Sequence, residues 1–300
     1  MTATTERREI VAGVDPLRNW HLAVAWAADE AHRRHLGLRL VSVVTPPPDA
    51  HHGRRPDHAR EHTHEPSHDT AHHRARQAEA REILHTAAAW AGDRRPGLPV
   101  TTALLDGAPA RVLAGLSHEA AMVVLGSRHL SRTEEFLSAG SLVVPVTAQA
   151  RCPVVVVGDA EHTTQDPPYL AVGVDGSASS RAALALAFEE ADLRGCALRA
   201  VAVWQPPVFS FHTGEELFHA ERRLLAETTA GWAEKYPDVR LTHEVLVGSP
   251  VERLAEAAEH ALALVLGRRG QGGYTGMRVG SVVHGLLHRA HCPVITVPVG

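Results

Sequence analysis

Residues 261–281 read ALALVLGRRGQGGYTGMRVGS, and this stretch decides the fold. It begins as an apolar run typical of a buried strand, continues through glycines at 267, 270 and 280, and ends where a helix-like pattern starts. Glycine lets main-chain N–H groups approach an anion, because it lacks a side chain and tolerates positive φ, and a helix start offers further N–H donors. We name residues 267–280 the glycine loop and predict that it binds the phosphates of a nucleotide. An ordinary strand-to-helix connection is the alternative.

The chain contains an internal repeat. Residues 10–47 align without gaps with residues 170–207 at an offset of 160, and the match resumes after the insert at offsets of 141 and then 140. We therefore predict two copies of one domain, at 1–158 and 169–300, joined by a linker at 159–168. Because the offset between the copies falls from 160 to 141, the first copy holds 19 additional residues. They lie in the region of a histidine-rich insert at about 48–73. Paired residues include Asp15 with Asp175, Gly126 with Gly267, Gly140-Ser141 with Gly280-Ser281, and Cys152 with Cys292.

Both copies alternate short apolar runs with alanine- and leucine-rich stretches of helical period. Near-continuous apolar strands separated by helices indicate a parallel sheet that is covered on both faces. We predict that each copy is a five-stranded, doubly wound α/β domain with a Rossmann-like fold. The predicted strands are 10–14, 38–44, 100–105, 122–125 and 154–157 in the first copy, and 170–174, 198–203, 241–247, 262–266 and 294–297 in the second.

The spacing G-x2-G-x9-G-S, the early Val-Asp pair and the tandem arrangement resemble the universal stress protein family over nearly the whole chain. The resemblance implies an adenine nucleotide alpha hydrolase-like fold, ATP as the ligand with or without Mg²⁺, and a nucleotide-dependent regulatory role in a stress response. Members of that family commonly dimerise through the last strand, which implies that strands 154–157 and 294–297 pair within this chain. A homodimer of chains and an unidentified signalling partner are compatible with the same resemblance.

In the second copy, the resemblance assigns Asp175 to the adenosine, the backbone of Val203 to adenine and Gly267 to the surroundings of the ribose. These positions follow the carboxyl ends of predicted strands, where open α/β sheets bind ligands. Asp175 has an alternative role as a cap for the helix that starts near Ser177. The resemblance places Gly270, Gly280, Ser281 and Val282 around the phosphates. Arg268, Arg269 and Arg278 are predicted to add positive charge beside them. The full predicted site comprises Gly173, Val174, Asp175, Val203, Gly267, Arg268, Arg269, Gly270, Gln271, Gly280, Ser281 and Val282.

The first copy departs from this pattern. His129 replaces the second glycine, ten residues separate it from Gly140, and Glu134-Glu135 bring carboxylates into the loop. A side chain strains a position that needs positive φ, and each carboxylate near a triphosphate repels it by about 1 kcal/mol even with water-like screening. We predict that nucleotide binding in this copy is weaker or absent. The residues that keep the pattern are Gly13, Asp15, Val43, Gly126, Ser127, Arg128, Gly140 and Ser141.

Composition and missing motifs narrow the classes of function. A net charge of −4 gives no electrostatic reason to expect nucleic acid or an anionic membrane as a partner, and no apolar run approaches 18 residues, so we expect a cytoplasmic protein. The only lysine, Lys235, lies far from any glycine loop, which excludes a P-loop nucleoside triphosphatase. No carboxylate follows Gly267, so we predict a binding module, not an enzyme. Slow ATP hydrolysis or phosphoryl transfer is the alternative.

The histidine-rich insert admits two interpretations. Eight histidines lie between His51 and His73, and in a helix several of them would face the same side. Such a face would hold Zn²⁺, Ni²⁺ or Cu²⁺ and would make the chain a metal-binding stress protein. The polar composition, with Pro56 and Pro66, instead favours a solvated and mobile insert. The candidate metal ligands are His58, His62, His64, His68 and His72.

Overall fold

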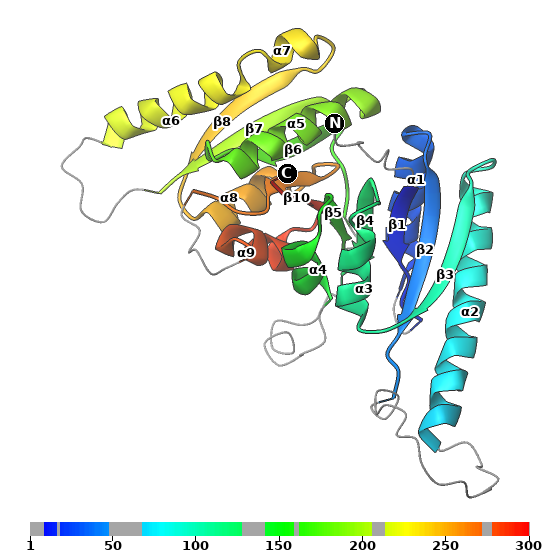
Figure 1. Cartoon of the computed structure of the whole chain (residues 1–300). Coiled ribbons are helices and arrows are strands. Elements are labelled where there is room, and N and C mark those ends of the chain that lie inside the picture. The colour runs from blue at the N-terminus through cyan, green and yellow to red at the C-terminus, as the bar shows by residue number, and fades with distance from the viewer. Residues whose placement is uncertain are drawn as a thin grey trace, which may run out of the picture.

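A computed structural model of the chain describes residues 9–16, 19–47, 68–127, 142–158, 162–205, 214–271 and 278–299, and at residues 68, 69 and 214–217 it describes the backbone alone. Across these residues the strands form one continuous sheet with helices on both faces (Figure 1). The strands are β1 (Glu9–Gly13), β2 (Gly37–Val44), β3 (Val100–Asp106), β4 (Met122–Gly126), β5 (Val154–Val157), β6 (Tyr169–Gly173), β7 (Ala197–Trp204), β8 (Leu241–Val247), β9 (Leu264–Gly267) and β10 (Val294–Val297). The helices are α1 (His21–Arg33), α2 (His68–Arg94), α3 (Pro109–Leu116), α4 (Val143–Gln149), α5 (Ala178–Arg194), α6 (Gly214–Thr229), α7 (Trp232–Lys235), α8 (Pro250–Ala257) and α9 (Ser281–Arg289).

The sheet consists of two parallel halves. The strand order is β3-β2-β1-β4-β5-β10-β9-β6-β7-β8, and all pairs within each five-strand half are parallel. The predicted fold class, two tandem five-stranded α/β domains, is therefore confirmed. In each half the chain first builds outward from its first strand and then returns to the other side of it. This reversal creates a crevice between β1 and β4 in the first domain and between β6 and β9 in the second.

The two faces of the sheet have different cores. On one face, α1, α2 and α5 cover a single apolar cluster that runs through both domains, from Ile10 and Leu84 to Leu184 and Ile295. On the other face, α3 with α4 and α8 with α9 cover two separate clusters. Alternate residues of each strand point to opposite faces, so strands buried on both faces must be apolar at every position. This requirement explains the runs of valine and leucine in the sequence.

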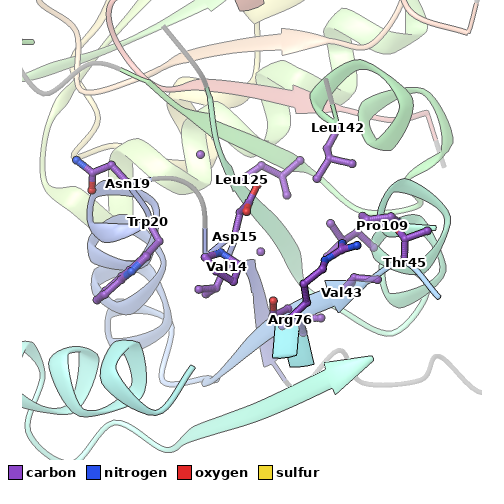
Figure 2. Close-up of a pocket in the computed structure, with 16 residues that line it drawn as sticks. Val14, Asp15, Asn19, Trp20, Val43, Thr45, Arg76, Pro109, Leu125 and Leu142 are labelled. Carbon is purple, nitrogen blue, oxygen red and sulfur yellow. The ribbon is translucent and has the colours of Figure 1, made fainter. Parts of the chain in front are cut away.

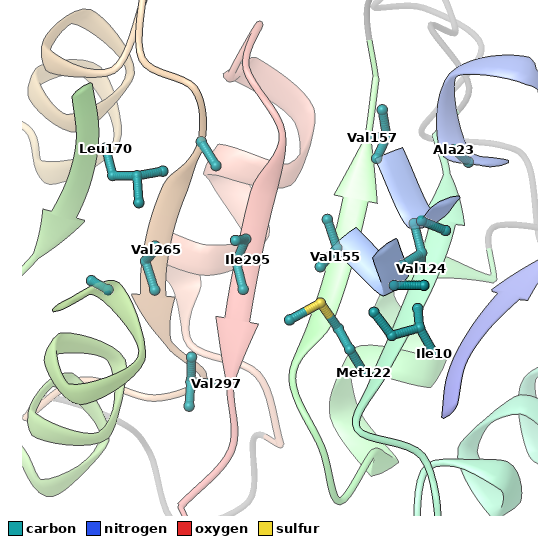
Figure 3. Packing of buried hydrophobic residues seen from close by; sticks show 14 of the residues in the cluster. Ile10, Ala23, Met122, Val124, Val155, Val157, Leu170, Val265, Ile295 and Val297 are labelled. Atoms are coloured by element: carbon teal, nitrogen blue, oxygen red, sulfur yellow. The ribbon is translucent and has the colours of Figure 1, made fainter. Parts of the chain in front are cut away.

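The halves join through β5 and β10, which pair antiparallel. The register matches Val294 with Val156 and Ile295 with Val155, and all four residues of each strand are buried. Figure 3 shows the side chains of Val155, Val265 and Ile295 in one core on the two sides of this junction. The pairing within the chain that the family resemblance implied is therefore present.

A buried group of charges reinforces the junction. Glu30, Arg34, Glu190 and Arg194 form what we name the charged quartet, in which each arginine bonds to both glutamates across α1 and α5. Both glutamate side chains are fully buried. Although burial opposes ionisation, Arg194 and Arg34 hold the pKa of Glu30 below its ordinary value, whereas burial and the charge of Glu30 raise the pKa of Glu190. The sequence offset of 160 repeats here, since Glu30 and Arg34 correspond to Glu190 and Arg194.

Part of the histidine-rich insert differs from its interpretation as a mobile segment. Helix α2 begins at His68, so residues 68–73 are helical, and the rest of the insert lies outside the described residues. The helix is held at this end because His73 and Gln77 both contact the Asp106 carboxylate at the end of β3. Farther along, Leu84 and Ala87 enter the core. Among the helices that the structure describes, none combines the length and apolar character needed to span a bilayer.

We expect Arg34→Met to lower the stability of the chain by about 3 kcal/mol, because it leaves the buried Glu190 carboxylate with only part of its compensation. For a chain of this size the midpoint of thermal unfolding should fall by roughly 5 °C. Arg33→Met is the control, since Arg33 is more exposed and, among the described residues, its ion pair is with Glu30. Equal and small shifts for both variants would contradict a stabilising role of the charged quartet.

Candidate functional site

A cavity of about 410 Å³ opens at the carboxyl ends of β6, β7 and β9. It lies at the crevice where the strand order reverses, and α6, α8 and the start of α9 complete its walls. We name it the second-domain cavity. All of the residues predicted for the second copy except Arg268 and Arg278 line it: Gly173, Val174, Asp175, Val203, Gly267, Arg269, Gly270, Gln271, Gly280, Ser281 and Val282.

Asp175 holds the glycine loop against the first strand of its domain. One carboxylate oxygen accepts a hydrogen bond from the backbone N–H of Ser177 at 3.0 Å, and the other accepts one from the backbone N–H of Gln271 at 2.9 Å. Although partial burial acts in the opposite direction, hydrogen bonds from Ser177, Gln271 and Ser180 hold the pKa of Asp175 below its ordinary value. The helix cap itself is Ser177, whose hydroxyl accepts from the N–H of Ser180 at 3.0 Å. The alternative role of Asp175 as the cap of α5 is therefore wrong.

The loop glycines are required by close approach. A Cβ at Gly267 would lie 2.5 Å from the carbonyl carbon of Ser179 in α5, and a Cβ at Gly270 would lie 2.5 Å from the Asp175 carboxylate. Within the described residues, no glycine of the loop has positive φ. For Gly267 and Gly270 the sequence argument from positive φ is therefore wrong, and what requires these two glycines is the tight packing of the loop against α5 and Asp175.

The first turn of α9 provides the amide donors of the site. Several loop amides already have protein acceptors: Gly280 donates to the Arg268 carbonyl, Arg269 to the Ser179 hydroxyl and Gln271 to Asp175. The N–H groups of the first turn have no partner inside their own helix and carry partial positive charge. No acidic residue occupies that turn of α9, which starts at Ser281. Ser281, Val282 and Val283 line the cavity, so it can receive an anion there.

Two of the arginines predicted as sources of positive charge, Arg268 and the exposed Arg278, do not line the cavity. The Arg268 guanidinium turns toward the first domain and donates to the carbonyl of Ala150, just beyond the end of α4, at 2.8 Å. Burial, followed by the charges of Arg269, Arg151 and Arg278, lowers the pKa of Arg268. The prediction that Arg268 adds positive charge beside the phosphates conflicts with this orientation. Arg269 does line the cavity.

Sequence reasoning missed the contribution of α6. Glu221 and Leu224 from this helix line the second-domain cavity, and Leu224 lies close to Gly176. The helix is amphipathic, and Leu225 enters the core. The amphipathic pattern predicts which side of α6 is buried. It does not predict which of the neighbouring residues line the cavity. Glu221 therefore brings a carboxylate to the cavity from outside the segment after Gly267, which contains none.

The first domain has a smaller cavity at the equivalent place, with a volume of about 240 Å³. We name it the first-domain cavity. Figure 2 shows Asp15 and Val43 at its wall and the side chain of Arg76, from α2, extending along it toward Pro109. Of the residues predicted for this copy, Gly13, Asp15, Val43 and Gly126 line the cavity and Ser127 does not, whereas Arg128, Gly140 and Ser141 lie outside the described residues, as do His129, Glu134 and Glu135.

The metal prediction falls largely outside the structure. His58, His62 and His64 lie outside the described residues, and so does the side chain of His68. His72 is an exposed residue of α2. Within the part of the chain that the structure describes, no group of three or more histidine, cysteine or acidic side chains is arranged to hold a metal ion.

Comparisons with known proteins agree with this geometry. A family model described as the universal stress protein family matches residues 6–158 and 170–298. Universal stress protein Rv1996 of Mycobacterium tuberculosis is 33% identical over 308 residues, which cover 98% of this chain and 96% of that protein. Universal stress protein Rv2623 of the same organism is 32% identical, with 95% of each chain covered. The crystal structure of a universal stress protein from Archaeoglobus fulgidus superposes with a TM-score of 0.71 at 17% identity, covering 98% of this chain and 97% of its own, and supports the fold.

The equivalent glycines of the two domains should respond differently to substitution. Gly267→Ala forces a Cβ to within 2.5 Å of the α5 backbone, so we expect a loss of about 1–3 kcal/mol of stability. Gly126→Ala places its Cβ no closer than 3.8 Å to its neighbours, and we expect a change within about 0.5 kcal/mol. Thermal unfolding of both variants tests the difference. A larger loss for Gly126→Ala would mean that the close approach does not explain the glycine.

Asp175 should make a pH-dependent contribution to stability. Its folded pKa is lowered, so the contribution is complete above the unfolded aspartate pKa of about 3.9 and is lost as the pH falls through the folded value. We expect the difference in thermal midpoint between the natural chain and Asp175→Asn to be constant above about pH 5 and to shrink below about pH 4. Asp238→Asn, at an exposed turn, is the control. A difference that grows on acidification would show that the ionised carboxylate does not hold the loop.

Proposed function

The chain belongs to the universal stress protein family, and on that premise we propose that its second domain binds an adenine nucleotide, with ATP as the ligand, and acts as a nucleotide-dependent regulatory module. The observation that carries the proposal is the second-domain cavity, where an apolar recess lies next to a cluster of anion-binding features. Val201, Val203 and Leu266 provide apolar surface, and Gly270 with the start of α9 lies at the other part of the wall. A ligand with a flat apolar base and an anionic tail complements both parts.

The proposed roles follow from these positions. The backbone of Val203, near the end of β7, contacts adenine, and Leu224 from α6 covers it. The phosphates lie against the first-turn amides of α9 and close to Arg269. Asp175 acts through the loop: it fixes the Gln271 amide and faces the adenosine with whatever acceptor capacity its two hydrogen bonds leave.

The first domain has a weaker site of the same kind in this proposal. Its cavity is smaller, about 240 Å³ against 410 Å³, and the substitutions in its loop remove a glycine and add acidic residues. Arg76 supplies a cation from α2, on the wall where α6 of the second domain supplies Glu221. We expect a ligand with fewer negative charges than ATP to be favoured there, because one arginine compensates less charge than a full phosphate loop does.

Binding is favoured over catalysis by the state of the carboxylates. Asp175 and Glu221 are the acidic residues that line the second-domain cavity among the described residues. Both oxygens of Asp175 already accept backbone N–H groups, so it is poorly placed to position an attacking water or a metal ion. A ligand that orders the loop differently from the empty state would instead shift the population of loop conformations that a partner encounters. Slow hydrolysis is the alternative, and formation of ADP on incubation with Mg²⁺ would favour it.

Titration calorimetry with ATP on nucleotide-free protein tests the proposal. We expect the natural chain to bind a single tight ATP, and Gly270→Ala to weaken that binding at least tenfold, or about 1.4 kcal/mol, because its Cβ displaces the Asp175 carboxylate. Gly115→Ala is the control, since a Cβ at this helical position in α3 meets no atom within 4 Å. Absence of heat from the natural chain with ATP, AMP and adenosine alike would refute nucleotide binding.

A further inference from the structure

Arg268 lies at the boundary between the domains, inside the glycine loop, between Gly267 and Arg269, which both line the second-domain cavity. Its Nη1 atom donates to the carbonyl oxygen of Ala150 at 2.8 Å and lies 3.4 and 3.5 Å from those of Ala148 and Thr147. These carbonyls belong to the end of α4 in the first domain, where a helix carries partial negative charge. The loop of one domain is thereby attached to a helix of the other.

The equivalent residue of the first domain cannot make this contact. Ser127 corresponds to Arg268 at the offset of 141, and the two backbones have the same role, since Ser127 donates to Val157 at 2.8 Å and Arg268 to Val297 at 2.9 Å. The two positions therefore differ in the side chain and not in the course of the chain. A serine is too short to reach a helix of the opposite domain, so Ser127 does not make the contact that Arg268 makes.

Helix α4 borders the first-domain cavity at its N-terminal end and packs against the core of the second domain. Its N-terminal flanking residue, Leu142, lines the first-domain cavity. Its Val144 and Ala148 pack against the apolar cluster beneath α8 and α9 of the second domain. Its last carbonyls receive Arg268. Arg268 therefore links the glycine loop to a helix whose flanking residue borders the other cavity.

The environment of Arg268 shows that this contact is maintained against opposing forces. The residue is partly buried, and burial together with Arg269, Arg151 and Arg278 lowers its pKa. Its Nε atom is buried and has no hydrogen-bond partner among the residues that the structure describes. A guanidinium with a purely electrostatic role beside phosphates would be more stable in solvent at the cavity mouth, where Arg269 is exposed.

We propose that Arg268 is a positioning residue that ties the glycine loop of the second domain to α4 of the first, so that nucleotide affinity in the second domain and the order of α4 depend on each other. This inference rests on the proposed nucleotide binding for its ligand-bound consequences. In the ligand-free chain, loss of the contact between Arg268 and α4 causes the glycine loop and the end of α4 to lose order together.

The ligand-free claim is tested by hydrogen–deuterium exchange on the full chain. The variants are Arg268→Met, Arg268→Lys and the control Arg240→Met, which removes the same charge from an exposed residue at the far end of the second domain. We expect faster exchange in Arg268→Met for the amides of Gly270 and Gln271 and for residues 147–151, with partial restoration in Arg268→Lys. Exchange that matches Arg240→Met in both segments would overturn the proposal, and this arm decides even if the natural chain binds no nucleotide.

The ligand-bound claim is tested by calorimetry with ATP and with adenosine as probes. We expect Arg268→Met to weaken ATP binding about tenfold and to leave adenosine binding unchanged, because adenosine lacks the phosphates that the loop holds. ATP should slow exchange in residues 143–150 of the natural chain but not in Arg268→Met. The same ATP-induced protection in both would overturn the coupling.

Salt distinguishes positioning from direct attraction. A through-space attraction between Arg268 and phosphate is screened by salt, whereas a misplaced loop is not. We therefore expect the affinity ratio of the natural chain to Arg268→Met to be the same at about 50 and about 500 mM KCl. A ratio that collapses toward one at high salt would assign Arg268 to the ligand and refute the positioning role. Absence of binding by the natural chain would instead refute the proposed function.

Discussion

The antiparallel pairing of β5 with β10 is the contact on which the rest of the structure depends. Each strand is the last of a parallel half, and alone it would present unpaired backbone groups at an apolar edge. Their pairing places α1 beside α5 and brings α4 into contact with the second-domain core. The charged quartet and the contact of Arg268 with α4 are both consequences of this arrangement, since each needs groups from both domains.

The second-domain cavity illustrates how close packing and ligand binding use the same residues. Gly267 and Gly270 allow the loop to lie against α5 and the Asp175 carboxylate, which leaves no space for a Cβ. Within the described part of the loop, the amides of Arg269, Gln271 and Gly280 donate to acceptors in the protein, and the start of α9 can receive an anion. A preformed site of this kind reduces the conformational entropy that a ligand must remove on binding.

At equivalent positions around the two cavities, the repeats differ in side chains where the strands and their hydrogen bonds correspond. Ser127 and Arg268 donate equivalent backbone hydrogen bonds, yet only the arginine reaches the opposite domain. Gly126 has space for a methyl group where Gly267 has none. Arg76 and Glu221 bring opposite charges to the two cavities. Two copies of one fold can in this way provide one well-organised site and one with different electrostatic properties.

The sequence by itself determined the repeat, the class of fold, the strands to within about two residues and most of the residues that line the second-domain cavity. It could do so because apolar periodicity and glycine spacing are local signals, and because parallel strands always present their carboxyl ends at one edge. Only the tertiary structure decided the direction of the Arg268 side chain, the reach of Glu221 and Arg76, and the burial of the charged quartet. Each of these depends on which surface lies opposite a residue, and for Arg268 and the charged quartet that surface belongs to a segment more than 100 residues away along the chain. It also decided that steric closeness to α5 and Asp175, and not positive φ, requires glycine at positions 267 and 270.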